Sequence, residues 1–373
     1  MQVSSRNTEK PSLEEKVAKL FFFGFQGTSS DDLDAIGRSA IELGVGGVIL
    51  YGHNIESKEQ VRRLLEYFKC KDRNILCAID QEGGRVQRLS SKNGFSDYPS
   101  ALELGQDPRL FAKISDMARD MRYVGVNMDF APVVDVHKNS CPVIGALSRG
   151  FSADPKEIFD NAYEFMLRMS QFAILTSLKH FPGHGSSRED SHKNVTDITE
   201  TWSEEELIPY KKMAQLKDRG DAPLLVKAHV IMTSHVINKN ISGLPVTLSP
   251  EWIKGVLQQK IGYRGVVVSD DLMMRALDDF STEEKIVSAL RAGCTMLIIS
   301  NYKTKDPITP EYGIEVVMRA MQDGRIPIGV IDQNYKLVMN IVKVLRQADE
   351  SYNIAHISDK NPQIEGFYNN PEL

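Results

Sequence analysis

Eight short apolar runs recur along the chain, and a longer amphipathic stretch follows most of them. Each run is continuously apolar instead of alternating between apolar and polar residues, which is typical of parallel strands that are buried on both faces. Eight strand–helix units predict an α/β fold, a (β/α)8 TIM barrel with the strands inside and the helices around them. The predicted strands are residues 20–25, 45–51, 74–80, 126–133, 174–181, 224–231, 265–270 and 295–300.

Helix start signals lie between these runs. Ser57 and Thr282 each precede apolar residues at helical spacing, and Pro155 and Pro250 stand where a helix accepts proline, at its first position. An alternative for residues 20–25 is core packing, which would favour an open, doubly wound sheet. No G-x-G-x-x-G motif follows the first run, so a dinucleotide-binding fold lacks its signature.

The length of the chain allows one large domain with a sizeable buried core, because 373 residues bury most of the surface that the unfolded chain exposes. We expect residues 1–348 to form a single catalytic barrel. The composition turns polar near the end of the chain, and residues 349–373 are predicted to be a C-terminal tail.

Charge and composition exclude several classes of partner. The net charge of −5 and the scattered Lys and Arg residues provide no basic surface for nucleic acid. No stretch reaches the roughly 18 apolar residues that a membrane span needs. The cysteines show no C-x-x-C spacing and are interpreted as reduced thiols, so we expect a cytoplasmic protein. We also expect a monomer without a cofactor. The cysteines are Cys70, Cys77, Cys141 and Cys294.

Ionisable residues cluster where the predicted strands end. In a (β/α)8 barrel the reacting groups lie at the carboxyl ends of the strands and in the loops that follow. Asp80 ends the third strand, Lys179 and His180 end the fifth, His229 lies near the end of the sixth, and Asp270 ends the seventh. Water also begins at strand ends, but the recurrence over four strands favours a functional site.

The segment after the fifth strand holds three histidines and supports two interpretations. A metal-dependent hydrolase would use His180, His184, His192 and His229 with Asp270. Proline and glycine between the first two histidines, however, prevent the helix that would place them on one face. Asp190 and His192 instead suit general acid/base chemistry, because a neighbouring carboxylate orients an imidazole and stabilises its protonated form. A structural alternative for Asp190 is a cap on the following turn.

Two further segments carry carboxylates. Asp270 closes a strongly apolar strand, which would hold a covalent nucleophile rigidly. The adjacent Asp271 has an alternative role as the cap of a following helix, and alternation alone leaves open which carboxylate faces the barrel axis. Residues 80–88 place acid, amide and arginine groups around a Gly-Gly turn, which suits sugar hydroxyls. A surface salt-bridge turn is the structural alternative for them.

Four motifs in this order resemble glycoside hydrolase family 3. They are IDQEGGRVQRL (79–89), FAPVVDV (130–136), KHFPGHG-x4-DSH (179–192) and VVSDDLMM (267–274). Within the family, the chain is similar to the single-domain bacterial β-N-acetylglucosaminidases (β-hexosaminidases) of peptidoglycan recycling. The resemblance covers about residues 15–345.

The resemblance implies a role for each matching residue. Asp270 would be the nucleophile, His192 the acid/base and Asp190 its partner. The residues implied to hold the terminal sugar are Asp80, Arg88, Arg149, Lys179 and His180. The segment before Arg149 departs from the family pattern, because residues 146–148 make it longer than usual.

The implied reaction removes terminal non-reducing N-acetylglucosamine in two steps with retention of configuration. The implied partner is a GlcNAc-containing muropeptide, a GlcNAc-1,6-anhydro-MurNAc-peptide. A neutral imidazole base repels anions less than a carboxylate does, which leaves a phosphorylase as an alternative to a hydrolase. Another family 3 glycosidase and a sugar-binding barrel without activity are further alternatives. Both catalytic motifs are intact, which argues against the last.

Overall fold

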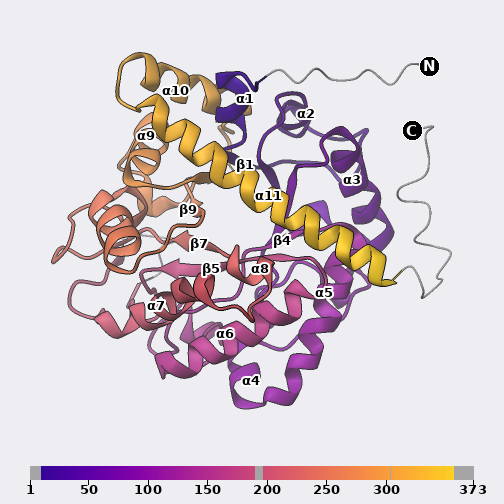
Figure 1. Cartoon of the computed structure of the whole chain (residues 1–373), viewed down its shortest axis with the longest axis vertical. Coiled ribbons are helices and arrows are strands. Elements are labelled where there is room, and N and C mark those ends of the chain that lie inside the picture. Colours follow the sequence, from indigo (N-terminus) through magenta and orange to yellow (C-terminus); the bar gives the residue numbers. More distant parts are fainter. Residues whose placement is uncertain (1–9, 190–195, 303, 357–373) are drawn as a thin grey trace.

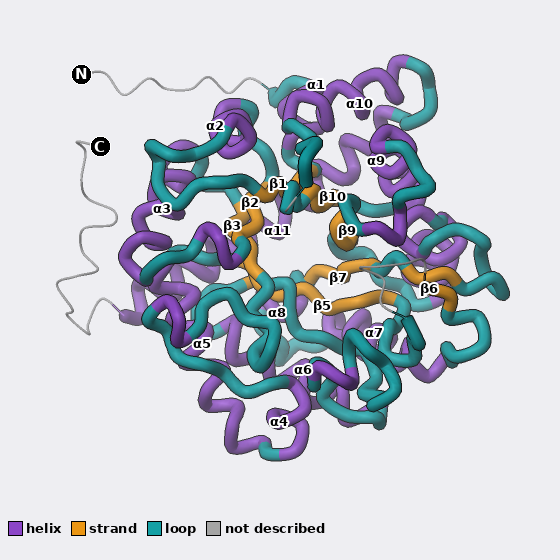
Figure 2. Tube along the Cα trace, turned by 180° about the vertical axis from the view of Figure 1, so that it is seen from behind, coloured by secondary structure: helices purple, strands orange, loops and turns teal. Residues whose placement is uncertain are grey.

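A computed structural model describes residues 10–189, 196–302 and 304–356 of the chain. Parallel strands form a closed barrel in the order β1-β10-β9-β7-β5-β4-β3-β2, which confirms the predicted (β/α)8 TIM barrel. Figure 2 shows the ring of strands at the centre of the molecule with the helices outside it. The strands are β1 (Phe21–Gly24), β2 (Gly47–Leu50), β3 (Leu76–Ile79), β4 (Met128–Asp129), β5 (Leu175–Phe181), β7 (Val230–Thr233), β9 (Val267–Asp271) and β10 (Met296–Ile299).

The first predicted strand is a barrel strand and not merely core packing. Phe22 of β1 is paired with Gly47 of β2 and with Ile298 of β10, so β1 closes the ring. A small two-stranded parallel sheet of β6 (Thr196–Asp197) and β8 (Val236–Ile237) lies outside the barrel.

The sixth predicted strand, residues 224–231, is wrong in its first half. Leu224–Lys227 form the short helix α8, and the strand β7 begins only at Val230. Leu225 and Val226 are buried because α8 packs against helices and against β5. A short buried apolar run can be either a helix or a strand, so the sequence alone does not distinguish the two. His229 therefore precedes its strand and lies at the amino end of the barrel, not at the carboxyl end as predicted.

The outer helices begin where the sequence signals predicted. Ser57 caps α3 (Lys58–Lys71), and Pro155 opens α6 (Pro155–Ser170). Residues Glu251–Lys260 form a π-helix after Pro250, and α9 (Thr282–Ala292) is capped by Ser281. The remaining helices are α1 (Leu13–Ala18), α2 (Ala35–Glu42), α4 (Ala101–Gln106), α5 (Ala112–Val124), α7 (Ile208–Ala214), α10 (Pro310–Gln322) and α11 (Ile328–His356).

The long helix α11 runs across the amino-terminal end of the barrel (Figure 1). It contacts α1 and α8, both of which precede strands, and Asn334 Nδ2 donates to the carbonyl of Cys294 just before β10. The helix continues beyond residue 348, so the predicted boundary between the barrel and the C-terminal tail falls inside α11. Arg122 of α5 donates to Asp349, which holds this part of the helix against the barrel. Residues 357–373 lie outside the described part.

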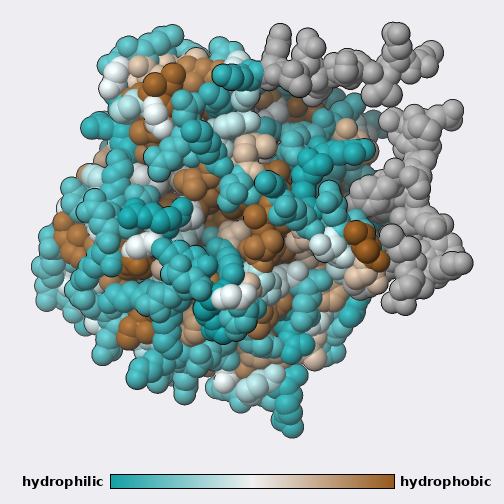
Figure 3. Space-filling model, in the orientation of Figure 1, coloured by the Kyte–Doolittle hydropathy of each residue, from teal (hydrophilic) through white to brown (hydrophobic). Residues whose placement is uncertain are grey.

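The face that α11 crosses is mainly hydrophilic, with hydrophobic side chains in separate groups (Figure 3). Among the helices of residues 10–189, 196–302 and 304–356, none combines the length and the apolar character that a membrane crossing requires. All four cysteines are free thiols, and Cys70 alone among them is exposed.

Because α11 covers the barrel end with buried side chains, Ile331→Ala should lower the free energy of unfolding by about 2–5 kcal/mol. Ile331 is fully buried, whereas Ile354 on the same helix is 71% exposed. The matched control Ile354→Ala should change stability by less than about 0.5 kcal/mol. Urea denaturation measures both, and equal effects would contradict the role of α11 as a barrel cover.

Candidate active site

A cavity of about 1220 Å³ lies at the carboxyl ends of the barrel strands. Asp80 follows β3, Lys179 and His180 belong to the end of β5, and Asp270 lies on β9, and all four line this cavity. Arg88 and Arg149, on the loops after β3 and β4, line it as well. The fold therefore brings together the described residues that the sequence predicted to bind or attack the sugar.

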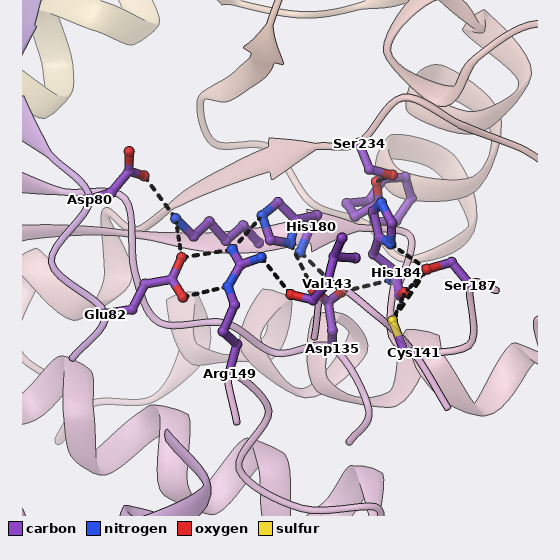
Figure 4. Close-up of polar contacts among 12 residues, drawn as sticks. Asp80, Glu82, Asp135, Cys141, Val143, Arg149, His180, His184, Ser187 and Ser234 are labelled. Atoms are coloured by element: carbon purple, nitrogen blue, oxygen red, sulfur yellow. Dashed lines mark hydrogen bonds and ion pairs between the residues drawn. The ribbon is translucent and has the colours of Figure 1, made fainter. Parts of the chain in front are cut away.

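Alternating charges connect three of the segments at the cavity. Lys179 Nζ lies 2.9 Å from Asp80 Oδ1 and 2.7 Å from Glu82 Oε1. Arg149 donates two hydrogen bonds of 2.8 Å to Glu82, and Arg88 donates one of 3.2 Å to Asp80. Figure 4 shows the Arg149 guanidinium pointing at the Glu82 carboxylate. Bidentate arginine–carboxylate geometry fixes orientation, so this network holds the cavity wall rigidly.

The charge network lowers the pKa of Glu82 well below its ordinary value. Burial alone would raise the pKa, but the positive charges of Arg149 and Lys179 and their hydrogen bonds outweigh it. The pKa of Asp80 is also lowered, because Lys179 and Arg88 outweigh burial there. Both carboxylates are therefore ionised acceptors at neutral pH.

The turn that carries Asp80 and Glu82 needs glycine. Gly83 has φ +88°, and a Cβ at this position would lie 2.1 Å from the carbonyl oxygen of Pro99. Gln81 closes the turn, because its side-chain oxygen accepts from the backbone amides of Arg88 and Leu89. This closure places Arg88 opposite Asp80.

Arg149 lines the cavity although the segment before it is longer than the family pattern. Gly145–Leu147 form a single 3-10 turn, after which the backbone amide of Arg149 donates to the carbonyl of Ile144. The extra residues are accommodated inside this turn. The guanidinium also donates to the carbonyl of Val143, and it points at Glu82 in the cavity wall.

His180 is oriented by the buried Asp135. The two groups are joined by a hydrogen bond of 2.7 Å between His180 Nδ1 and Asp135 Oδ2, and Asp135 Oδ1 accepts from the backbone amides of His180 and His184. The arrangement makes Nδ1 the donor and leaves Nε2 as an acceptor, 3.4 Å from an Arg149 nitrogen. The lining of the cavity thus includes an imidazole whose orientation is fixed by a buried carboxylate.

Asp270 and Asp271 both line the cavity, but they make different contacts. Asp271 Oδ1 accepts from the backbone amides of Met273 and Ser300, and so ties the turn after β9 to the end of β10. Burial raises the pKa of Asp271 to about 6. Residues 272–274 form a turn, so Asp271 does not cap a helix there. Asp270 Oδ1 accepts from the backbone amide of Asp271, which fixes its carboxylate at the strand end.

The predicted acid/base residues Asp190 and His192 lie outside the described residues. The segment leading to them is described as far as residue 189. In it, His184 Nδ1 lies 2.8 Å from Ser187 Oγ, which also lies 3.3 Å from Cys141 Sγ. Burial lowers the pKa of His184 to about 4, so this histidine is neutral and structural.

The metal interpretation loses two of its proposed ligands in the described part of the chain. His229 is at the opposite barrel end, where Nδ1 bonds to the carbonyl of Val226, and His184 is held by Ser187. No group of three or more His, Cys, Asp or Glu residues among the described positions has the geometry of a metal site.

Sequence reasoning missed two residues of the site, Glu82 and Asp135. Both lie inside motifs that we had singled out, at 79–89 and 130–136. Their roles depend on partners distant in sequence, Arg149 for Glu82 and His180 for Asp135. The available signal was an acidic residue within an otherwise apolar or glycine-rich stretch.

A closed barrel with carboxylates, cations and an oriented histidine around one cavity at its carboxyl end is the architecture of an enzyme that binds a small polyhydroxylated substrate. The profile of the glycosyl hydrolase family 3 N-terminal domain matches residues 12–341. The chain therefore belongs to glycosyl hydrolase family 3.

Similar proteins in this family are named as β-hexosaminidases or β-N-acetylglucosaminidases. The β-hexosaminidase of Thioalkalivibrio sulfidiphilus is 33% identical over 298 residues, which are 76% of this chain and 80% of the relative. The structure of a β-N-acetylhexosaminidase from Beutenbergia cavernae superposes with a TM-score of 0.78 at 26% identity, covering 90% of this chain and 99% of the other. A family 3 β-N-acetylglucosaminidase from a Paenibacillus species gives 0.77 at 28% identity, and there the coverage is 91% of this chain and 64% of the other. The prediction of a β-hexosaminidase-type glycoside hydrolase is confirmed.

Removing the charge of Glu82 should destabilise the fold, because Arg149 and Lys179 would remain buried with less compensation. We expect Glu82→Gln to lower the free energy of unfolding at pH 7 by about 3–5 kcal/mol. Since its folded pKa lies below the ordinary 4.5, the wild-type contribution is present above that pH and is lost on acidification. The variant and the wild type should therefore converge as the pH falls.

Denaturant titrations at several pH values measure this difference. The matched control is Glu283→Gln, which removes surface ion pairs with Arg319 and Arg325 and should cost less than about 1 kcal/mol. A gap between wild type and Glu82→Gln that stays constant down to pH 3 would speak against the ionised role of Glu82.

Proposed function

We propose that this protein is a retaining exo-β-N-acetylglucosaminidase that removes terminal non-reducing β-linked N-acetylglucosamine. The observation that carries the proposal is the position of Asp270 in the same cavity as the charge network of Asp80, Arg88, Lys179 and Arg149. That network supplies acceptors and donors for several hydroxyls, and Asp270 supplies a carboxylate at a rigid strand end. A nucleophile beside a hydroxyl-binding wall is what a glycosyl-enzyme mechanism needs.

In the proposed first step, Asp270 attacks the anomeric carbon while protonated His192 gives its proton to the leaving oxygen. The glycosidic C–O bond breaks, and an ester between the sugar and Asp270 forms. In the second step, neutral His192 takes a proton from water, whose oxygen attacks the anomeric carbon and releases Asp270. Asp190 would orient the imidazole and stabilise its charged form.

The remaining residues of the network are proposed to hold the terminal sugar. Asp80 accepts from hydroxyl groups, while Arg88 and Lys179 donate to sugar oxygens or brace Asp80. His180, oriented by Asp135, offers Nε2 toward the cavity, and Arg149 supports both His180 and Glu82. Because these groups already bond to one another, they lose little freedom when a sugar binds.

Two arginines at the cavity favour an anionic leaving group. Arg85 and Arg275 are exposed, line the cavity, and form no ion pair with another described residue. A muropeptide carries carboxylates that these cations would attract. We therefore propose a GlcNAc-1,6-anhydro-MurNAc-peptide as substrate, in cell-wall recycling. The free thiols are consistent with the reducing cytoplasm, and we propose that the enzyme acts there as a monomer.

The nucleophile can be tested by trapping. A 2-deoxy-2-fluoro glycosyl donor should glycosylate Asp270 with loss of its leaving group, and mass spectrometry should find the added sugar on the peptide that contains it. Asp270→Ala should lower turnover by more than about 10⁴-fold. The control Asp278→Ala, at an exposed position after the same strand, should keep wild-type activity. Hydrolysis without any label on Asp270 would favour attack by the substrate's own 2-acetamido group.

The acid role of His192 predicts a dependence on the leaving group. His192→Ala should slow cleavage of an alkyl or sugar aglycone by about 10²–10⁴-fold, and that of an activated aryl glycoside much less. A series of aryl N-acetylglucosaminides with different leaving-group pKa values measures this slope. Uniform loss across the series would refute the acid role. The same assays with added phosphate, analysed for sugar phosphate, distinguish hydrolysis from phosphorolysis.

A further inference from the structure

The cavity is larger than one sugar requires. Its volume of about 1220 Å³ exceeds the roughly 300–1,000 Å³ of pockets that take drug-sized ligands. The charge network occupies one wall. The outer part is lined by loops that follow β2 and β10, which contribute Tyr51 and Tyr302. This outer part is available to whatever is attached to the terminal sugar.

Three aromatic rings form a platform at this outer part, consisting of Tyr51, His53 and Tyr302. The Tyr302 ring lies 4.9 Å from Tyr51 and 5.6 Å from His53, with interplanar angles of 16° and 15°. Tyr51 and His53 are 6.1 Å apart and nearly parallel. If Tyr51 and His53 lay on opposite faces of the Tyr302 ring, their own ring centroids would be much farther apart than 6.1 Å. Both rings therefore lie against the same face of Tyr302. Tyr302 itself is 42% exposed and lines the cavity.

Hydrogen bonds hold the His53 ring and the backbones of Tyr51 and Tyr302. His53 Nε2 lies 2.9 Å from the carbonyl oxygen of Phe25, and the backbone amide of Tyr51 donates to Asn54. The backbone amide of Tyr302 donates to Ser300 Oγ.

The backbone before Tyr302 is fixed as well. Asn301 adopts φ +48°, which asparagine tolerates, and its side chain forms two hydrogen bonds with the backbone of Ile308. The backbone of Tyr302 is therefore held in place, and its ring is stacked on Tyr51 and His53.

The platform is continuous with the catalytic wall. Arg88 lies over the Tyr51 ring at 5.8 Å, and the Asp271 and Asp80 charges contribute to raising the pKa of Tyr51, after burial. Ser300, which holds Tyr302, also donates its backbone amide to Asp271. These contacts place the rings beside the carboxylates of Asp80 and Asp271.

We propose that the Tyr302 ring, backed by Tyr51 and His53, binds the first sugar ring of the leaving group and so determines aglycone specificity. This inference rests on the proposed glycosidase function. The occupant is a pyranose, because a pyranose offers a face of C–H groups that packs on the electron-rich face of an aromatic ring. A rigid aromatic surface binds such a face at low cost in side-chain entropy.

The test measures binding at the two sugar positions separately. It uses the Asp270→Asn variant, because this variant should not hydrolyse the ligands. Isothermal titration calorimetry compares N,N′-diacetylchitobiose, which spans both positions, with N-acetylglucosamine, which fills only the terminal one. Tyr302→Ala should weaken chitobiose binding by about three- to tenfold and N-acetylglucosamine binding by less than about twofold. Tyr302→Phe keeps the ring and should bind both ligands like the parent.

Tyr312→Ala is the matched control, because Tyr312 is 39% exposed on α10 and does not line the cavity. It should change neither affinity. Equal weakening of both ligands by Tyr302→Ala, or no weakening of chitobiose, would overturn the inference. Failure of the wild type to hydrolyse chitobiose would overturn the proposed function. The comparison of the two affinities would still test whether the platform binds the second sugar. Absence of binding by either saccharide would overturn both.

Discussion

The contact between Glu82, Arg149 and Lys179 is the constraint on which the rest of the site depends. It joins the turn after β3, the long segment after β4 and the end of β5, which are far apart in the sequence. All three side chains are buried, so separating any one would leave charge without solvation. Asp80 and His180 contact these groups directly, and Arg88 is linked to them through Asp80.

The barrel could be predicted because buried parallel strands have a direct sequence signal, and the residues at their ends follow from the fold. The sixth strand was misplaced because the apolar residues 224–227 fit a buried helix as well as a buried strand. As a result, His229 was predicted at the carboxyl end of the barrel, whereas it lies at the amino end. Motif resemblance pointed to Arg149, which lines the cavity although the segment before it is longer than usual. It did not identify Asp135, whose role lies in a contact with His180 that spacing does not encode.

The inner wall and the outer part of the cavity differ in the kind of side chains that line them. The inner wall uses charged groups that already bond to one another, which suits a single sugar in one orientation. The outer part combines stacked rings with arginines on exposed positions, which suits recognition by face and charge with less demand on exact placement.

The position of α11 has a consequence for how the protein is made. Strand β1 pairs with β10, and the helix that covers the amino ends of the strands spans residues 328–356, so neither closure is possible until most of the chain exists. During synthesis the early strands emerge with their barrel neighbours still absent and their apolar faces uncovered. Closure of the barrel therefore waits until the segment that contains β10 and α11 has been synthesised.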